Sequence, residues 1–177
     1  MGLNMEELVL SFEGKSTIRA FRKGVIPGLM AQGYDLNRAV KTAMGLGLCI
    51  HENTVHNIVV TQAKVLIAQF LNLEAVTGLN YHALGLGATA PGASDTLLEI
   101  EATRKVITSA ARNGTSIVLS TYYTAAQSTY NIKEGGIFCN GATATANSGT
   151  LFSHFSQSED NSLGLNDLTF EYAFRIK

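Results

Sequence analysis

The chain has 177 residues, of which 46% are hydrophobic and 15% charged, whereas an ordinary globular domain carries about 25% charged residues. This length suits one domain with a substantial core. The formal net charge is −1, so there is no basic field to collect phosphates, which disfavours a nucleic-acid partner. The shortage of charge and the 17 glycines indicate a loop-rich β protein, or one whose surface is partly covered by neighbours.

The two cysteines, Cys49 and Cys139, lie among apolar or small residues. We interpret them as free thiols in a reducing compartment, with a single disulfide between them as the alternative. The first residues lack the charged region and apolar run of a signal peptide, and no apolar run reaches transmembrane length. Met1-Gly2 does not form a myristoylation site, because Glu6 stands where Ser or Thr is required. We therefore expect a protein made in the cytoplasm, without a membrane partner.

Residues 1–55 are predicted to form an N-terminal extension that contains one helix and packs on the body or on a neighbour. The helix is expected to begin after Asp35, which can cap it, and to end near Gly45. Pro27-Gly28 is expected to break any helix at that point of the chain, and Met5–Phe12 is apolar enough for a strand or a short helix. A basic cluster in this region is interpreted as a solvated face; it consists of Lys15, Arg19, Arg22 and Lys23.

Residues 56–177 are predicted to form a helix followed by a β-rich domain. The helix spans about Thr61, as its cap, to Asn72, and its apolar positions cover most of its circumference, which favours burial on more than one side. Period-2 alternation and turn signals then predict strands. These strands are expected at residues 79–83, 103–109, 116–124, 132–139, 150–155 and 168–176. The predicted fold class is α+β, mainly β: an antiparallel β-sandwich or partial barrel with N-terminal helices packed on it.

Two phosphate-binding motifs nearly match. Gly85–Ala90 fits a relaxed dinucleotide fingerprint, but Pro91-Gly92 follows at once, so the helix that would hold the pyrophosphate has no place to start. Glu13–Ser16 ends like a phosphate-binding loop, yet the loop's first glycine is replaced by Val9. We interpret both segments as turns, and we predict no cofactor.

Metal and catalytic motifs fail in a similar way. His51 and His56 are five residues apart, whereas a zinc helix needs histidines four apart. A site made with the nearby Cys49 is the weaker alternative to loop histidines. The C-terminal acidic residues lack the alternate spacing of a calcium loop; they are Glu159, Asp160 and Asp167. No nucleophile elbow is present in the sequence. We therefore predict no metal, no catalytic residue and no enzyme.

Residues 57–155 carry, in order, the segments "NIVVTQAKVLIAQFLN", "LNYHALGLGATAP", "SDTLLEIEATRKVI", "NGTSIVLSTYYTA", "IKEGGIFCN" and "GTLFSHFS". This order resembles small structural proteins of tailed-phage virions, of the tail-fibre or collar-fibre attachment type or the head-decoration type. The residues that match this pattern are Ala83, Leu84, Gly85, Gly87, Thr89, Pro91, Asp95, Thr96, Leu98, Glu101, Arg104, Glu134, Gly136, Ile137, Phe138, Gly149, Thr150 and Phe152. Turn, core and capping roles account for them. Asp95 is expected to cap a short helix, on which Glu101 and Arg104 would form a pair one turn apart.

The resemblance implies a structural component of a tailed-phage virion, on the tail or collar side, that anchors or forms a fibre or adaptor. A capsid decoration protein is the alternative. A second alternative is a receptor- or glycan-binding module, in which Tyr122, Tyr123 and Tyr130 would supply stacking surfaces, although strand packing explains them better. The expected partners are other proteins of the virion tail, collar or capsid, and we expect a homo-oligomer. The expected location is the virion, after synthesis in the host cytoplasm.

Overall fold

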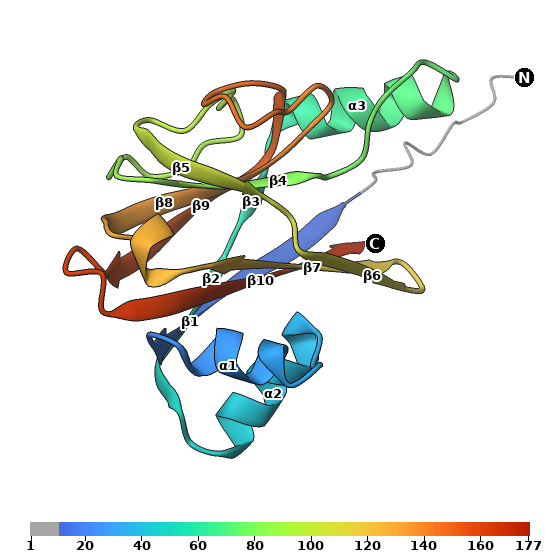
Figure 1. The fold of residues 1–177 in the computed structure, drawn as a ribbon. Coiled ribbons are helices and arrows are strands. Elements are labelled where there is room, and N and C mark those ends of the chain that lie inside the picture. Colours follow the sequence, from blue (N-terminus) through green and yellow to red (C-terminus); the bar gives the residue numbers. More distant parts are fainter. Residues whose placement is uncertain (1–10) are drawn as a thin grey trace, which may run out of the picture.

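The protein is described from a computed structural model, which covers residues 11–177. Two five-stranded antiparallel sheets pack face to face (Figure 1). Sheet 1 contains, in spatial order, β2 (Cys49–His56), β1 (Phe12–Arg22), β10 (Asn166–Ile176), β7 (Ser116–Tyr123) and β6 (Ser109–Asn113). Sheet 2 contains β3 (Ile58–Val59), β9 (Thr150–Asp160), β8 (Asn131–Cys139), β4 (Tyr81–Gly85) and β5 (Glu101–Val106). The helices are α1 (Val25–Ala31), α2 (Leu36–Gly45), α3 (Thr61–Leu71) and the short 3₁₀ helix η1 (Ala125–Gln127). The predicted mainly β sandwich is confirmed.

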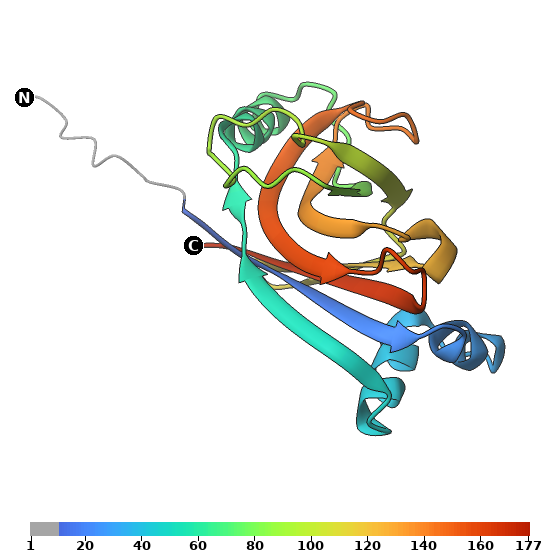
Figure 2. The same cartoon turned by 90° about the vertical axis from the view of Figure 1, so that its left-hand side faces the viewer.

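The chain passes directly from one sheet to the other at both long sides of the sandwich. On one side Asn57 separates β2 from β3: its backbone N–H donates to Gly14 of sheet 1, and the N–H of Val60 donates to Phe152 of sheet 2. On the other side Ile107-Thr108 connects β5 to β6, and these two N–H groups donate to Asn80 and to Ser120. Strands that change sheet in this way form the corners of a flattened barrel. Figure 2 shows the resulting curvature of β8 and β9.

The main core lies between the two sheets. The alternation predicted for the last strand is confirmed, because one face of β10 is buried here and the other points outward. Sheet 1 contributes mainly Ile18, Leu119, Tyr123, Leu168, Phe170, Tyr172 and Phe174, and sheet 2 contributes Leu84, Ile132, Ile137 and Phe155. Each fully buried large apolar side chain contributes about 2 kcal/mol, so these two faces account for most of the stabilisation.

The N-terminal helices cover the outer face of sheet 1 (Figure 1). Their contacts form a separate apolar cluster of Phe21, Ile26, Leu36, Ala39, Ala43 and Tyr122. As predicted, Asp35 caps α2, where its side chain accepts a hydrogen bond of 2.8 Å from the N–H of Arg38. The prediction that Pro27 prevents a helix is wrong: it lies in the first turn of α1. A proline is tolerated there because N–H groups of the first turn have no partner within the helix.

Residues 11–55 do not form an extension attached to a separate body. β1 lies between β2 and β10 and pairs with β10 from Phe12 to Arg22, so the proposed boundary after residue 55 does not separate two units. Residues 11–55 contain two helices, where one was predicted. The histidines expected in a loop, His51 and His56, lie in β2, where the neighbouring Glu52 binds Arg19 at 2.6 Å. Arg19 is thus an ion-paired strand residue, with a side chain 14% exposed. Most of the segment Met5–Phe12 falls outside the described residues.

The helix predicted after residue 60 is confirmed as α3, although Val60 is its N-cap and Thr61 its first residue. It lies at one end of the sandwich and contacts β9 (Figure 1). Among residues 11–177, no helix combines the length and the apolar character needed to cross a membrane.

Candidate functional site

Two long loops cover the outer face of sheet 2. Residues 86–100 and 140–149 run over β4, β8 and β9 with little regular structure, and we call them together the loop layer. Leu98 from the first loop and Ala142 from the second pack with side chains of the sheet below. Those side chains are Val60, Ala83, Phe138 and Leu151. Loops without regular structure need other partners for their backbone groups, and here buried charged side chains supply them.

Glu134 of β8 is the first anchor of the loop layer. Its side chain is 1% exposed and accepts hydrogen bonds from three backbone N–H groups: Gly87 at 3.0 Å, Glu99 at 3.0 Å and Ile100 at 2.8 Å. His154 of β9 completes the set, with its Nε2 atom 3.0 Å from Glu134 Oε2. One carboxylate therefore fixes both ends of the 86–100 loop to the sheet.

His154 also reaches the middle of the same loop. Its Nδ1 atom lies 2.7 Å from Oδ2 of Asp95, which accepts a second hydrogen bond of 2.7 Å from the N–H of Gly92. The expectation that Asp95 caps a helix is wrong, because residues 93–98 form no helix; the carboxylate closes a turn instead. The imidazole thus lies between two carboxylates, Asp95 and Glu134.

The electrostatics of this group favour the charged forms. Burial alone would raise the pKa of Glu134, but His154 and the three backbone donors lower it to about 2. Burial likewise opposes protonation of His154, yet its two carboxylate partners outweigh burial and raise its pKa. The pKa of Asp95 is lowered: its hydrogen bonds to Gly92 and His154 outweigh burial. Because both ring nitrogens of His154 bind carboxylates, neither is free to take a proton from a substrate.

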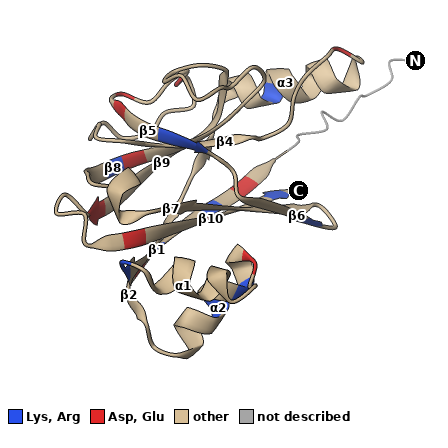
Figure 3. Ribbon diagram, viewed as in Figure 1, with Lys and Arg blue, Asp and Glu red and all other residues tan. Residues whose placement is uncertain are grey.

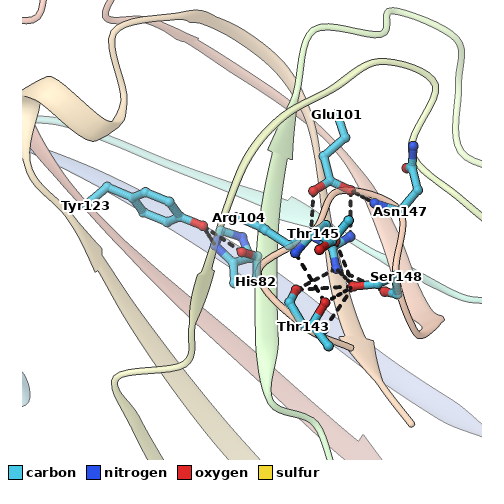
Figure 4. Close-up of polar contacts among 8 residues, drawn as sticks. All are labelled: His82, Glu101, Arg104, Tyr123, Thr143, Thr145, Asn147 and Ser148. Carbon is cyan, nitrogen blue, oxygen red and sulfur yellow. Dashed lines mark hydrogen bonds and ion pairs between the residues drawn. The ribbon is translucent and has the colours of Figure 1, made fainter. Parts of the chain in front are cut away.

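Arg104 of β5 is the second anchor (Figure 4). Its guanidinium binds Glu101 through two N–H groups, at 2.5 and 2.6 Å, and both side chains are almost completely buried. The remaining terminal nitrogen donates to the carbonyl oxygens of Ser148 at 2.9 Å and Thr143 at 3.2 Å. The same guanidinium lies 4.5 Å above the ring of Phe138. This pair therefore holds the 140–149 loop on the sheet.

The predicted Glu101–Arg104 pair is present, but the helix predicted to carry it is not. Both residues lie in β5, where residues three apart normally point to opposite faces. In the pairing with β4, Glu101 lies opposite Gly85 and Thr103 opposite Leu84, so Ala102 is an extra residue. Because of this β-bulge, the side chains of Glu101 and Arg104 lie on the same face of β5.

The glycines of the motif make room for these anchors. A Cβ on Gly85 or Gly87 would come within 2.4 or 2.6 Å of the side chain of Glu134. Gly149 has a φ of +77°, and a Cβ there would lie 2.5 Å from the backbone of Ala142. A Cβ on Gly136 would lie 2.8 Å from the side chain of Leu151 and 3.0 Å from that of Leu98.

Most of the motif residues thus gather at the outer face of sheet 2, although they lie far apart in the sequence. Pro91 is half-buried in the loop layer, and Phe138 lies beneath Arg104. Leu84, Ile137 and Phe152 are exceptions, because they face the core between the two sheets. Phe152 packs there against Phe174 of sheet 1, with ring centroids 5.2 Å apart. An irregularity in the pairing of β8 with β9 between Ile137 and Phe138 leaves Phe152 without a partner and turns it to the inner face.

Sequence reasoning missed three buried polar groups. It gave no role to His154. It placed Asp167 in an acidic cluster, whereas this carboxylate is 2% exposed and accepts from the N–H groups of Gly24, the N-cap of α1, and Ala125, the first residue of η1. His82 is buried next to Tyr123, whose hydroxyl donates to the His82 carbonyl at 2.7 Å (Figure 4). Burial lowers the pKa of His82 to about 3. The alternation of His82 with apolar residues placed it on the polar face of the predicted strand, so no signal in the sequence indicated its burial.

Most of the residues considered for a metal site or for glycan stacking bind other groups or are buried. Nδ1 of His51 lies 2.6 Å from Glu159, and the Cys49 thiol donates to the His51 carbonyl, so these groups have other partners than a metal ion. Within residues 11–177 no group of three or more His, Cys, Asp or Glu side chains is arranged so that it could hold a metal ion. Tyr122 and Tyr123 are 8% and 0% exposed, which removes them from any glycan-stacking surface. Both cysteines are free, as predicted.

The chain matches no protein-family model, and no curated protein or solved structure is significantly similar to it. Its function is therefore inferred from the motif residues and from the geometry that they adopt.

Proposed function

We propose that the chain is a structural component of a tailed-phage virion, on the tail or collar side, where it anchors or forms a fibre or adaptor. The observation that carries the proposal is the convergence of the motif residues on the two anchors of the loop layer. Gly87, Glu134 and Arg104 all serve to fix irregular backbone rigidly on a sheet. A module that presents a binding surface within a particle needs such rigid loops, whereas it needs no group that is free to react.

The surface of the loop layer supports a role in assembly. Leu86, Leu97 and Ile100 are exposed on it, and its other exposed residues are mainly small, such as Ala88 and Ala90. Figure 3 shows how few charged residues interrupt the ribbon in this region. Exposed apolar side chains with little charge among them are typical of surfaces that other proteins cover.

The test is to purify particles from a host that carries the gene and to measure the chain by quantitative mass spectrometry. We expect a fixed number of copies per particle, which stay with the tails after heads and tails are separated. Absence of the chain from intact particles would overturn the proposal. Copies that stay with the heads would instead support capsid decoration, for which the same rigid loop layer would be suitable.

A variant links this test to the loop layer. Arg104→Ala should remove the anchor of the 140–149 loop and reduce incorporation of the chain into particles, because a loosened loop no longer presents one surface. Arg112→Ala is the matched control, since Arg112 is exposed in β6 and binds only the nearby carbonyl of Gly114. Equal incorporation of both variants would disconnect the loop layer from assembly.

A further inference from the structure

The outer face of α3 lacks a partner within residues 11–177. The helix buries only Ala63 and Leu66 against the sandwich. Val65, Ala68 and Leu71 follow one another at helical spacing on the opposite side and are exposed. Apolar faces of helices are normally buried, so this exposed apolar stripe on α3 indicates a contact with a partner outside residues 11–177.

The end of α3 adds an independent observation. Leu73 follows the helix with a φ of +61°, a conformation that favours glycine, and its side chain is 95% exposed. The N–H of Glu74 closes this turn by donating to Gln69 at 3.0 Å. A leucine here costs about 1 kcal/mol relative to glycine and gains no packing within residues 11–177. Leu71, 74% exposed, extends the stripe of Val65 and Ala68 to this end of the helix.

We propose that this face binds α3 of a second copy of the chain, with the two helices antiparallel about a two-fold axis near Ala68. Such an interface must be self-complementary. In an antiparallel pair centred on Ala68, Val65 of each helix lies beside Leu71 of the other, and the small Ala68 lets the helices approach closely. The stripe of Val65, Ala68 and Leu71 is therefore complementary to the same stripe on a second copy, and the interface needs no other surface of the chain.

The charges favour the antiparallel arrangement. Lys64 lies near the start of the helix and Glu74 just after its end, and both are exposed. Figure 3 shows no other charged residue along α3. An antiparallel pair brings Lys64 of one copy near Glu74 of the other at both ends, whereas a parallel pair brings like charges together. A single lysine beside a single glutamate also lacks the basic excess that binds anionic membranes.

The first experiment is sedimentation velocity of the full chain at several concentrations, with variants of α3. We expect a reversible dimer, and we expect Leu71→Glu to weaken it about tenfold or more, as loss of a central contact does. Leu163→Glu is the control, because Leu163 is 80% exposed on the loop between β9 and β10, far from α3 in sequence. A chain that stays monomeric at all concentrations, or a dimer equally sensitive to both variants, overturns the proposal.

The charge pair gives a sharper test. Lys64→Glu and Glu74→Lys should each weaken the dimer, and the double variant should restore it, because the swapped charges again face each other. A double variant that is weaker than both single variants overturns the antiparallel arrangement.

Disulfide trapping tests the position of the axis. In a Cys49→Ser background, Ala68→Cys should form a covalent dimer on oxidation, whereas Thr61→Cys, at the first position of the helix, should not. The reverse result overturns the proposal. This inference does not depend on the virion role: a monomer that copurifies with particles would overturn it and leave the proposed function intact.

Discussion

Glu134 shows at the scale of one residue how this chain replaces regular structure with a buried charge. Its carboxylate satisfies backbone N–H groups from Gly87, Glu99 and Ile100 as well as His154. Removal of one partner of a buried pair costs about 3–5 kcal/mol, because the other charge remains without compensation. We expect Glu134→Gln to lower the free energy of unfolding by about 3 kcal/mol. The chain has no tryptophan, so urea denaturation followed by circular dichroism is the suitable measurement.

The neighbouring Glu99 provides the control. It is exposed and accepts a hydrogen bond from the N–H of Thr89 at 2.9 Å. A glutamine at this position keeps an acceptor oxygen, so Glu99→Gln should cost less than about 1 kcal/mol. Equal losses in Glu134→Gln and Glu99→Gln would contradict the role given to the buried carboxylate.

The two buried histidines predict opposite pH dependences. The pKa of His154 is raised above 6.5, so its stabilisation is complete below that pH and is lost as the pH rises through the raised value. The pKa of His82 is lowered from 6.5 to about 3, so the protein loses stability as the pH falls below 6.5. From these two groups, stability should be greatest near neutral to slightly acid pH.

Urea denaturation across this range separates the two contributions. His154→Gln should remove the loss of stability that sets in as the pH rises above 6.5 and leave the acid side unchanged. The exposed His56 is the control, and His56→Gln should keep the alkaline dependence of the wild type. An unchanged alkaline dependence in His154→Gln would assign it to another group.

At the scale of elements, the 140–149 loop offers a matched pair of glycines. Gly141 and Gly149 both have positive φ, +84° and +77°. A Cβ on Gly141 meets nothing within 4 Å, whereas one on Gly149 meets the backbone of Ala142 at 2.5 Å. Gly141→Ala should therefore cost only the left-handed strain of about 1 kcal/mol. Gly149→Ala should cost about 3 kcal/mol, because the loop must also move off the sheet. Denaturation gives both values, and similar losses would show that the loop adapts freely.

Prediction from sequence succeeded where the side-chain pattern reports burial directly. β10 alternates between apolar and polar residues, and the pattern of α2 gives its cap and its buried side. It failed for β1 and β2. The outer face of β1 carries Lys15 and Arg19, and its inner face includes the small residues Ser16 and Ala20, so no apolar alternation appears. β2 is a polar edge strand of its sheet, and its residues are mostly exposed.

The anchors of the loop layer could not be predicted from the sequence. The partners of Glu134 are backbone N–H groups 34 to 47 residues away, and every residue except proline has such a group. The spacing of Glu101 and Arg104 correctly predicted a pair. It could not separate a helix from a bulged strand, because both place residues three apart on one face. The fold of the sheets decides between them.

At the scale of the whole molecule, the corner at Asn57 connects the two sheets through a side chain as well as through the backbone. Its Nδ2 atom donates to Ser153 of sheet 2 at 2.7 Å and to the hydroxyl of Tyr172 of sheet 1 at 3.0 Å. Tyr172 is buried, and burial raises the pKa of its hydroxyl. The amide therefore joins two buried polar groups that no water reaches.

Loss of this amide tests whether the corner holds the sheets together as one unit. Asn57→Ala leaves two buried hydroxyls without their donor, so we expect the free energy of unfolding to fall by about 2–3 kcal/mol. Tyr172→Phe removes one of these groups, and the double variant should therefore cost clearly less than the sum of the single variants. Because chain corners join the sheets on both sides, each variant should still unfold in one transition. Strictly additive losses would show that Asn57 and Tyr172 stabilise the sandwich independently. Two separate transitions would show that the sheets fold as separate units.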